Sequence, residues 1–241
     1  MTLSAAVMAH PDRADMVTDL LARLDRPVPV VWDEKQDRHD TGIRALRAHD
    51  PTATHHLVIQ DDALPCVDLL ASVERALDYV PDGHPVSFYT GKVRPFRREI
   101  ERAVAGAEGQ ASWLRFPGPY WGPAIVVPVA DIPALDEWWS GDGAGITNYD
   151  RRIARYFQPT GRDCWYSWPS LVDHRGDDST VTGHKTARHA HKAVGPGVSG
   201  LTVDWSGEVL TLDQAQRLDA QRQREAMAAR RRARPSLANR G

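Results

Sequence analysis

The stretch LVIQDDALPC, residues 57–66, decides the fold that we predict. Its first three residues form an apolar run without alternation, which is typical of a strand buried on both faces. Asp61 and Asp62 would then stand at the carboxyl end of that strand, where open α/β sheets bind their ligands. Two adjacent carboxylates repel each other unless a cation or a donor network offsets their charge, so a divalent metal with oxygen ligands is a natural occupant. The alternative is two solvated aspartates at an ordinary strand-to-loop junction.

The segments on either side alternate between strand and helix patterns. AAVMA at 5–9 and VPVVW at 28–32 predict strands, and apolar residues at helical spacing predict a helix over 12–24 between them. This order begins a parallel βαβ arrangement. Further strands are predicted at 85–89, 121–127 and 165–168, and further helices at 41–49, 68–79, 94–104, 131–139 and 148–157. We therefore expect an α/β fold, with one mixed, mostly parallel central sheet flanked by helices.

Composition indicates a globular protein. Of 241 residues, 41% are hydrophobic and 26% are charged, which is ordinary for such a domain. No apolar run approaches the ~20 residues of a membrane helix, and the N-terminus lacks the basic region of a signal peptide. A cytoplasmic location is expected by default, in the host cytoplasm if a phage encodes the chain. Cys66 and Cys164 have no metal-type spacing and are expected to be small core residues.

Charge is distributed unevenly along the chain. Residues 215–241 carry eight arginines against Asp219 and Glu225, a balance of +6, so a formal net charge of -2 leaves -8 for the rest. We expect the main domain to cover 1–180, followed over 181–241 by a flexible arm and a basic helix. Thr182–Gly200 lacks periodicity and predicts a mobile arm. Thr211 and Gln214 form a capping-box pattern that would open the Arg-rich helix.

Three features far apart in sequence point to one kind of chemistry. They are the Asp pair, the glycine-rich stretch GDGAGIT (141–147) before a helix that carries Asp150, and the run PSLVDH (169–174). Their order and spacing resemble the GT-A fold glycosyltransferases, and are most similar to small phage-type and lipopolysaccharide-type (family 25-like) enzymes. The resemblance spans roughly Ser4 to Ser179. The matching residues are Val58, Ile59, Gln60, Asp61, Asp62, Pro169, Ser170, Leu171, Val172 and His174.

The resemblance implies transfer of a sugar from a nucleotide-sugar donor to an acceptor hydroxyl. A divalent cation would neutralise the donor diphosphate as it binds and as it leaves. Asp62 and His174 would hold that cation, and this mixed ligand set suits Mn²⁺ better than calcium. Mg²⁺ is the alternative cation. Gln60 stands where many relatives have an acid, which makes Asp61 more important as the contact to the donor sugar. The alternative for His174 is a surface or core histidine.

The same resemblance assigns further donor contacts. The strand and loop from Met8 to Arg13 would contact the nucleoside through His10 and Arg13, with Arg13 close to the phosphates or the base. Asp33, at the end of the second predicted strand, is a candidate partner for the base or ribose. The alternatives are a surface charge at a helix N-terminus for Arg13 and an ordinary loop acid for Asp33.

Asp150 is the candidate general base, because displacement at the sugar carbon needs a group that deprotonates the acceptor hydroxyl. Its alternative role is favourable placement of an acid in the first turn of a helix. Trp138 and Trp139 are candidates for stacking on an acceptor sugar, although aromatic pairs at a helix end are more often core residues. The acceptor is left open between a phage or envelope protein, a glycan and modified DNA.

The basic segments have two interpretations each. The arm carries a basic cluster formed by His184, Lys185, His189, His191 and Lys192. It would close over the diphosphate, with these residues offsetting the phosphate charge, or it would be only a solvated linker. The Arg-rich tail would attract a nucleic acid or an acidic protein, or serve only for solubility. Two other functions compete with a glycosyltransferase. One is a metal-dependent phosphoesterase or nuclease using Asp61, Asp62 and His174, and the other is a nucleic-acid-binding module built around the tail.

Overall fold

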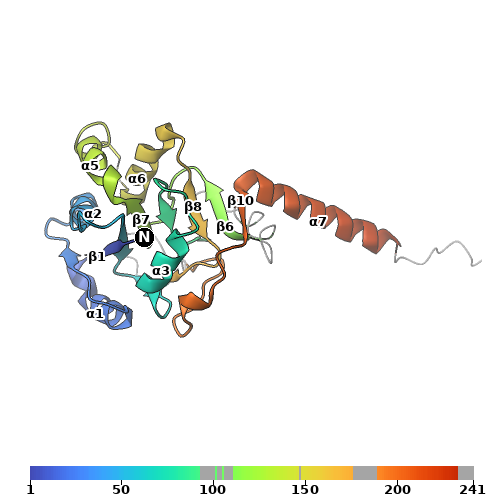
Figure 1. The fold of residues 1–241 in the computed structure, drawn as a ribbon, viewed down its shortest axis with the longest axis horizontal. Helices are drawn as coiled ribbons and strands as arrows, with labels where there is room; N and C mark the ends of the chain where they lie inside the picture. Colours follow the sequence, from blue (N-terminus) through green and yellow to red (C-terminus); the bar gives the residue numbers. More distant parts are fainter. Residues whose placement is uncertain (93–100, 102–104, 106–110, 147, 176–188, 233–241) are drawn as a thin grey trace, which may run out of the picture.

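The structure, a computed structural model, describes residues 1–92, 101, 105, 111–146, 148–175 and 189–232 (Figure 1). It is an α/β fold built on a mixed eight-stranded sheet that helices flank, in the order β10-β6-β8-β5-β7-β3-β1-β2. The sheet strands are β1 (Leu3–Ala9), β2 (Val30–Trp32), β3 (His55–Gln60), β5 (Val86–Ser87), β6 (Ala111–Phe116), β7 (Ala124–Pro128), β8 (Cys164–Ser167) and β10 (Glu208–Thr211). A separate two-stranded ladder joins β4 (Ala63–Pro65) to β9 (Val172–His174).

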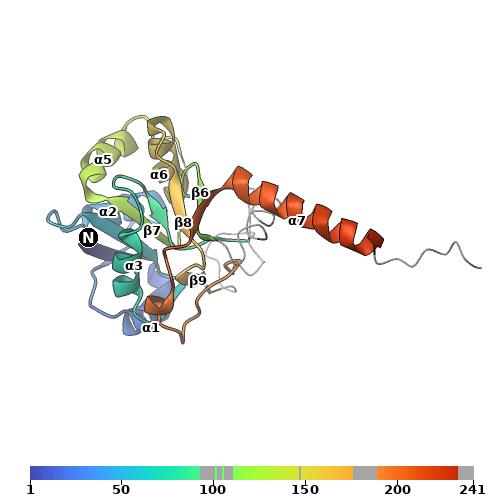
Figure 2. The ribbon, with the colours of Figure 1, turned by 45° about the vertical axis from the view of Figure 1, so that its right-hand side comes forward.

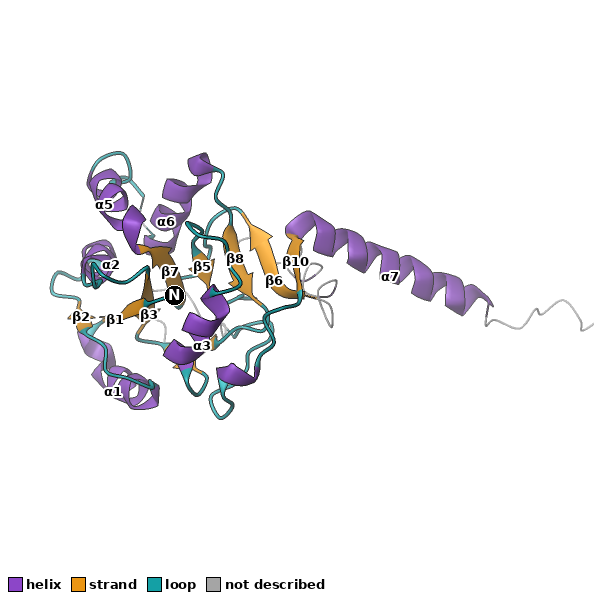
Figure 3. Cartoon of the chain, viewed as in Figure 1, coloured by secondary structure: helices purple, strands orange, loops and turns teal. Residues whose placement is uncertain are grey.

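Helices cover both faces of the sheet, while the last helix projects from the domain (Figure 3). One face packs residues such as Leu57 and Ile59 against the helices α1 and α3, and the other packs Val58 and Ile125 against α2, α5 and α6. The α-helices whose bounds the structure describes are α1 (Ala14–Arg23), α2 (Arg38–Arg47), α3 (Leu69–Leu77), α5 (Ile132–Ser140), α6 (Tyr149–Phe157) and α7 (Leu212–Arg232). Short 3-10 turns are η1 (Pro11–Arg13), η2 (Val129–Asp131), η3 (Gln158–Thr160) and η4 (Gly200–Thr202).

The position of β3 confirms the prediction made from its apolar run. It pairs in parallel with β1 and antiparallel with β7, so neighbouring strands cover both of its edges. Leu57, Val58 and Ile59 are fully buried. The parallel pairing of β1 with β2, across α1, likewise confirms the predicted βαβ start. Four of the seven pairings in the large sheet are parallel, and three are antiparallel.

The far end of the sheet differs from the prediction. No strand was predicted over 111–116, yet β6 covers these residues and ends at Phe116, whose ring stacks on Tyr166 of β8 with centroids 3.9 Å apart. β10 was not predicted, and it pairs in parallel with β6 at the sheet edge. Trp205 is buried against Trp113, just before that strand. The sheet therefore continues past the expected boundary at residue 180. The predicted helix over 94–104 lies almost wholly outside the described residues.

The second half of the predicted arm lies against the core. Lys192 accepts a hydrogen bond through its carbonyl from the backbone N–H of Ser170 at 2.9 Å, and Val194 donates back to Ser170 at 2.9 Å. The N–H of His191 donates to the carbonyl of Thr90 at 2.9 Å. These bonds to two core segments hold the backbone of residues 190–194, so this part is a docked segment and not a free arm. Residues 182–188 lie outside the described residues.

The helix α7 begins as predicted and then leaves the body. Gln214 N–H donates to Thr211 Oγ1 at 3.2 Å, and Thr211 N–H donates to Gln214 Oε1 at 2.9 Å, which confirms the capping box. Its first turns have the apolar contacts that the sequence did not indicate, because Ala215 is buried and Leu218 packs beside it. Residues 223–229 are exposed, and Figures 1 and 2 show the helix projecting from the domain. No described helix is long and apolar enough to cross a membrane.

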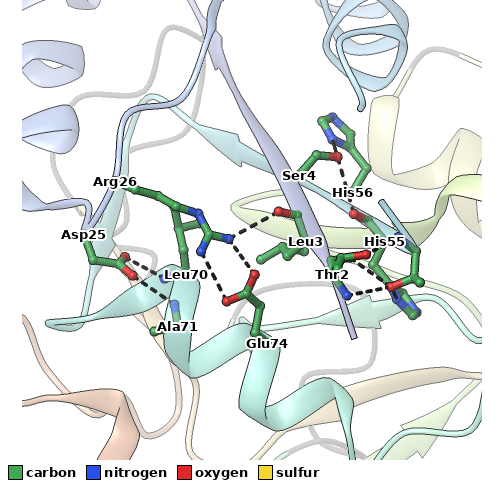
Figure 4. Close-up of polar contacts among 11 residues, drawn as sticks. Thr2, Leu3, Ser4, Asp25, Arg26, His55, His56, Leu70, Ala71 and Glu74 are labelled. Atoms are coloured by element: carbon green, nitrogen blue, oxygen red, sulfur yellow. Dashed lines mark hydrogen bonds and ion pairs between the residues drawn. The ribbon is translucent and has the colours of Figure 1, made fainter. Parts of the chain in front are cut away.

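The start of α3 is capped from a distant segment (Figure 4). Asp25 Oδ1 accepts from the N–H of Leu70 at 2.8 Å, and its Oδ2 accepts from the N–H of Ala71 at 3.0 Å. Asp68 holds the N-cap position but makes no capping bond there. Since the first N–H groups of a helix have no partner within the helix, Asp25 supplies the missing acceptors.

Neighbouring contacts tie α3 to the first strand (Figure 4). Arg26 donates to both carboxylate oxygens of Glu74, at 2.8 and 3.2 Å, and to the carbonyl of Leu3 at 3.2 Å. On β3, His56 Nδ1 lies 2.8 Å from Ser4 Oγ, and burial lowers the pKa of His56 to about 4. His56 is therefore neutral near pH 7 and joins two strands as a structural residue.

We predict that Asp25→Ala lowers the free energy of unfolding by about 0.5–2 kcal/mol, the usual cost of losing a helix cap. Urea denaturation followed by circular dichroism measures this change. The matched control is Asp82→Ala, in an exposed turn. A loss no larger than that of the control would show that Asp25 does not act as the cap of α3.

Candidate functional site

A buried charge cluster lies at the carboxyl ends of β1 and β3. Arg13 Nη1 donates to Asp61 Oδ1 at 2.6 Å and to Asp62 Oδ2 at 2.7 Å. The N–H of His10 donates to Asp61 Oδ2 at 2.7 Å. Arg13, Asp61 and Asp62 are 9%, 5% and 6% exposed. The two aspartates are therefore not solvated loop acids, and Arg13 is not a surface charge.

His174 joins this cluster through the small ladder. β9 pairs antiparallel with β4, and the register sets His174 opposite Ala63, next in sequence to Asp62. His174 Nε2 lies 3.3 Å from Asp62 Oδ2, and its Nδ1 lies 2.8 Å from the carbonyl oxygen of Arg175. Because a carbonyl oxygen only accepts, the hydrogen of the neutral ring belongs on Nδ1. The Nε2 atom of that tautomer turns a lone pair toward the carboxylate.

The charges in the cluster do not cancel without a further positive charge. Two carboxylates face one guanidinium, and a neutral His174 would turn one acceptor atom toward another. Either a proton on Nε2 or a metal cation relieves that contact. Burial acts to raise the pKa of Asp62, but His174 and Arg13 outweigh it and hold this pKa below its ordinary value. Asp62 Oδ1 is buried and accepts no hydrogen bond from the described residues.

The residues at hand supply part of a metal site. Asp62, in the turn before β4, and His174, at the end of β9, offer an oxygen and a nitrogen ligand. Within the part of the chain that the structure describes, no three His, Cys, Asp or Glu side chains form a group that would hold a metal ion alone. A cation here would therefore need ligands from water or from a bound phosphate, as Mg²⁺ sites often do.

Asp33 lies at the same edge of the sheet but its carboxylate serves the local loop. Its N–H donates to the carbonyl of Ala9 at 2.7 Å, which sets it beside His10. Its Oδ1 accepts from the N–H groups of Lys35 at 3.1 Å and Asp37 at 3.0 Å. The contacts fit the loop-acid alternative, and a role in binding a nucleoside stays a prediction.

Asp150 lies on the other face of the sheet. The start of α6 packs on the start of α2, where Arg38 donates to Asn148 Oδ1 at 3.0 Å and the Tyr149 ring covers Gly42 so closely that a Cβ there would meet it at 2.5 Å. Since α2 follows the carboxyl end of β2, Asp150 belongs to the same edge as Asp61. Among the described residues no hydrogen bond or ion pair links Asp150 to the charge cluster.

The environment of Asp150 suits a proton acceptor near neutral pH. Burial of the carboxyl group raises the pKa of Asp150 to about 6, against the opposing effects of the Arg151 N–H, 2.7 Å from Oδ1, and of Arg38. The carboxyl group is thus protonated below about pH 6 and ionised above it. An ionised carboxylate with a raised pKa is a better base than an ordinary surface aspartate.

Sequence reasoning missed Arg152, which holds the glycine-rich segment in place. This buried side chain donates to the carbonyls of Ile146 at 2.6 Å, Ala144 at 2.8 Å and Trp139 at 3.4 Å. Its guanidinium also lies 5.0 Å from the centre of the Trp139 ring. Trp139 is a core residue and not an exposed stacking platform, while Trp138 is half-buried. The available signal was an arginine three residues after Tyr149, on the apolar face of that helix.

The run PSLVDH connects the cluster to the docked segment. Ser170 Oγ accepts from the N–H of Thr90 at 2.9 Å. Asp173 Oδ1 accepts from the N–H of Ala190 at 2.7 Å, and its Oδ2 lies 3.2 Å from His189 Nδ1. Lys192 lies 5.9 Å above the ring of Trp168. Of the predicted basic arm, His184 and Lys185 lie outside the described residues.

We predict that the carboxyl carbon of Asp150 titrates near pH 6 in a ¹³C NMR pH series, about two units above an ordinary aspartate. Burial is the cause, so Asp50, whose pKa is lowered by its bonds from Thr52, is the internal reference. Absence of this titration from Asp150→Asn assigns the signal. An Asp150 midpoint at or below 4 would remove the argument for a tuned base.

Comparison of the sequence with protein-family models gives no match, and comparison with curated proteins gives no significant match. The likeness to GT-A glycosyltransferases therefore rests on the short motifs quoted above and on the chemistry of the residues that they contain.

Proposed function

We propose that this chain is a metal-dependent glycosyltransferase with a GT-A-like domain, which moves a sugar from a nucleotide-sugar to an acceptor hydroxyl. The observation that supports it most is the pair formed by Asp62 and His174 at the carboxyl edge of the sheet. Nδ1 of the histidine is committed to a backbone carbonyl, and its Nε2 faces a carboxylate oxygen 3.3 Å away. This arrangement is typical of a histidine prepared to bind a metal.

In this proposal Asp62 and His174 hold Mn²⁺, or Mg²⁺. Asp62 Oδ1 has capacity to bind, because it accepts no hydrogen bond from the described residues. A bound cation would neutralise the charge of the donor diphosphate. This lowers the free-energy barrier to departure of the nucleoside diphosphate as the leaving group. The carbonyl of Arg175 orients the imidazole by accepting from Nδ1.

The donor would lie across the ends of β1, β2 and β3. His10, Arg13 and Asp33 follow the first two strands, and Asp61 follows the third. We assign His10 and Arg13 to the nucleoside and phosphates, Asp33 to the base or ribose, and Asp61 to the donor sugar. Asp61 already accepts from Arg13 and from the N–H of His10, which fixes the orientation of its carboxylate.

Asp150 takes the role of general base in the same proposal. Its carboxyl group is ionised above about pH 6, so it accepts the acceptor's hydroxyl proton at neutral pH. Arg152 positions the segment before it through three carbonyls, which supports a defined wall on the acceptor side. The acceptor itself is a phage or envelope protein, a glycan or modified DNA.

A phosphoesterase or nuclease is the competing enzyme. It would use Asp61, Asp62 and His174, and it usually needs more carboxylates and histidines around two metal ions. No such larger group forms among the residues that the structure describes. The competing function without catalysis is a binding module built around the Arg-rich tail. In that case the buried charge cluster would take no part in binding.

We predict that the protein hydrolyses one donor of a nucleotide-sugar panel slowly, and only with Mn²⁺ or Mg²⁺. Asp62→Asn and His174→Ala should lose Mn²⁺ binding in calorimetry, since the first removes the negative charge of one ligand and the second removes the other ligand. Asp150→Asn is the matched control, because it should keep Mn²⁺ binding and lose about 10²–10⁴-fold in turnover. Unchanged Mn²⁺ affinity in both ligand variants would overturn the metal assignment. Cleavage of phosphodiesters in place of nucleotide-sugars would favour the competing enzyme.

We predict that the tail recruits a polyanionic acceptor, a nucleic acid or an acidic protein. Because Ala215 and Leu218 pack on the body, the truncation should begin after Gln221. Donor hydrolysis should be unchanged, and transfer to a macromolecular acceptor at low salt should fall. A full-length variant with Arg230, Arg231 and Arg232 changed to Gln shows whether the charge or the length of the tail is needed. Transfer that depends on contacts to phosphate should weaken as the salt concentration rises. Equal transfer by truncated and full-length enzyme would exclude recruitment.

A further inference from the structure

We propose that Arg13 is an exchangeable counter-ion, whose guanidinium bridges Asp61 and Asp62 until a divalent cation binds at Asp62 and displaces it. This inference rests on the proposed metal site. It adds a competition between a residue of the chain and the cation, and it resolves a conflict over Arg13. The resemblance assigns Arg13 to the donor, whereas the structure pairs it with both aspartates.

Two contacts of Arg13 are ones that a cation would make. A single nitrogen, Nη1, reaches both carboxylates at 2.6 and 2.7 Å. Arginine commonly meets a carboxylate with two nitrogens in a parallel fork, as Arg26 does with Glu74. Here one nitrogen bridges two acids, as one metal ion would.

The bridge and a bound cation oppose each other. Asp62 Oδ2 accepts from Arg13 and also faces His174 Nε2, so a cation between Asp62 and His174 would lie beside the guanidinium. Like charges at so short a distance repel each other. The two carboxylates are too few to neutralise both the guanidinium and a divalent cation. Cation binding therefore weakens the Arg13–Asp62 contact, and by reciprocity that contact weakens cation binding.

The bridge also accounts for the burial of two adjacent carboxylates. A buried carboxylate that has no positive partner is strongly destabilising, and Arg13 supplies that partner. Arg13 ends the short turn η1, so its side chain belongs to a segment outside the strands of the sheet. Once displaced from Asp62, the guanidinium is available to an anionic phosphate at the same edge.

The test measures Mn²⁺ binding by calorimetry, with the metal alone as the probe. Arg13→Met should bind Mn²⁺ on the order of tenfold more tightly than the wild type, because the competing charge is gone. Its Tm in EDTA should fall, and saturating Mn²⁺ should restore it. The control is Arg26→Met, which loses an ion pair away from the cluster and should lose stability without any gain in Mn²⁺ affinity.

The outcomes distinguish failure of the Arg13 exchange from failure of the metal site. If wild type and Arg13→Met bind Mn²⁺ equally, or the variant binds more weakly, the exchange is overturned, and loss of binding in Asp62→Asn then shows that the metal site itself stands. If neither protein binds Mn²⁺, the metal assignment and the exchange both fail. Arg13→Gln keeps N–H donors without the charge, so it tests the same gain in affinity if Arg13→Met does not fold.

Discussion

The buried contact of Arg13 with Asp61 and Asp62 is the interaction on which the site depends. Two buried carboxylates after a largely buried strand would each need water or a positive partner, and burial removes the water. The guanidinium supplies the partner and at the same time joins the chain after β1 to the chain after β3. Local charge balance and long-range topology are therefore set by the same three side chains.

The topology explains why residues so distant in sequence meet. Parallel pairing of β1 with β3 brings two strand ends to one edge, and the β4–β9 ladder adds His174 from more than one hundred residues later. On the opposite face, the packing of α6 on α2 brings Asp150 to that edge, and Arg152 fixes the segment before it. The sheet therefore gives two polar groups, one on each face, that share an edge without touching among the described residues.

The sequence predicted the parts of the fold that have a regular pattern. The apolar run of β3, the amphipathic α1 and the capping box at Thr211 were all read correctly, because periodicity and local hydrogen bonds determine them. β4, β9 and β10 have three or four residues each, too few to show a period, and their pairing depends on distant segments. β6 was hidden by the turn residues Pro117 and Gly118 that follow it. In the site, the nearness of Asp62 and His174 followed from motifs, whereas the bridging role of Arg13 and the three carbonyls of Arg152 follow only from packing.

The central claim is that the edge formed by Asp62 and His174 binds a divalent cation. The most direct measurement is an anomalous difference map from a crystal soaked in Mn²⁺. The account predicts a peak about 2.0–2.3 Å from a carboxylate oxygen of Asp62 and from His174 Nε2, with the Arg13 guanidinium moved away from Asp62. Arg13 still bridging both aspartates, with no peak beside His174 at saturating Mn²⁺, would contradict it.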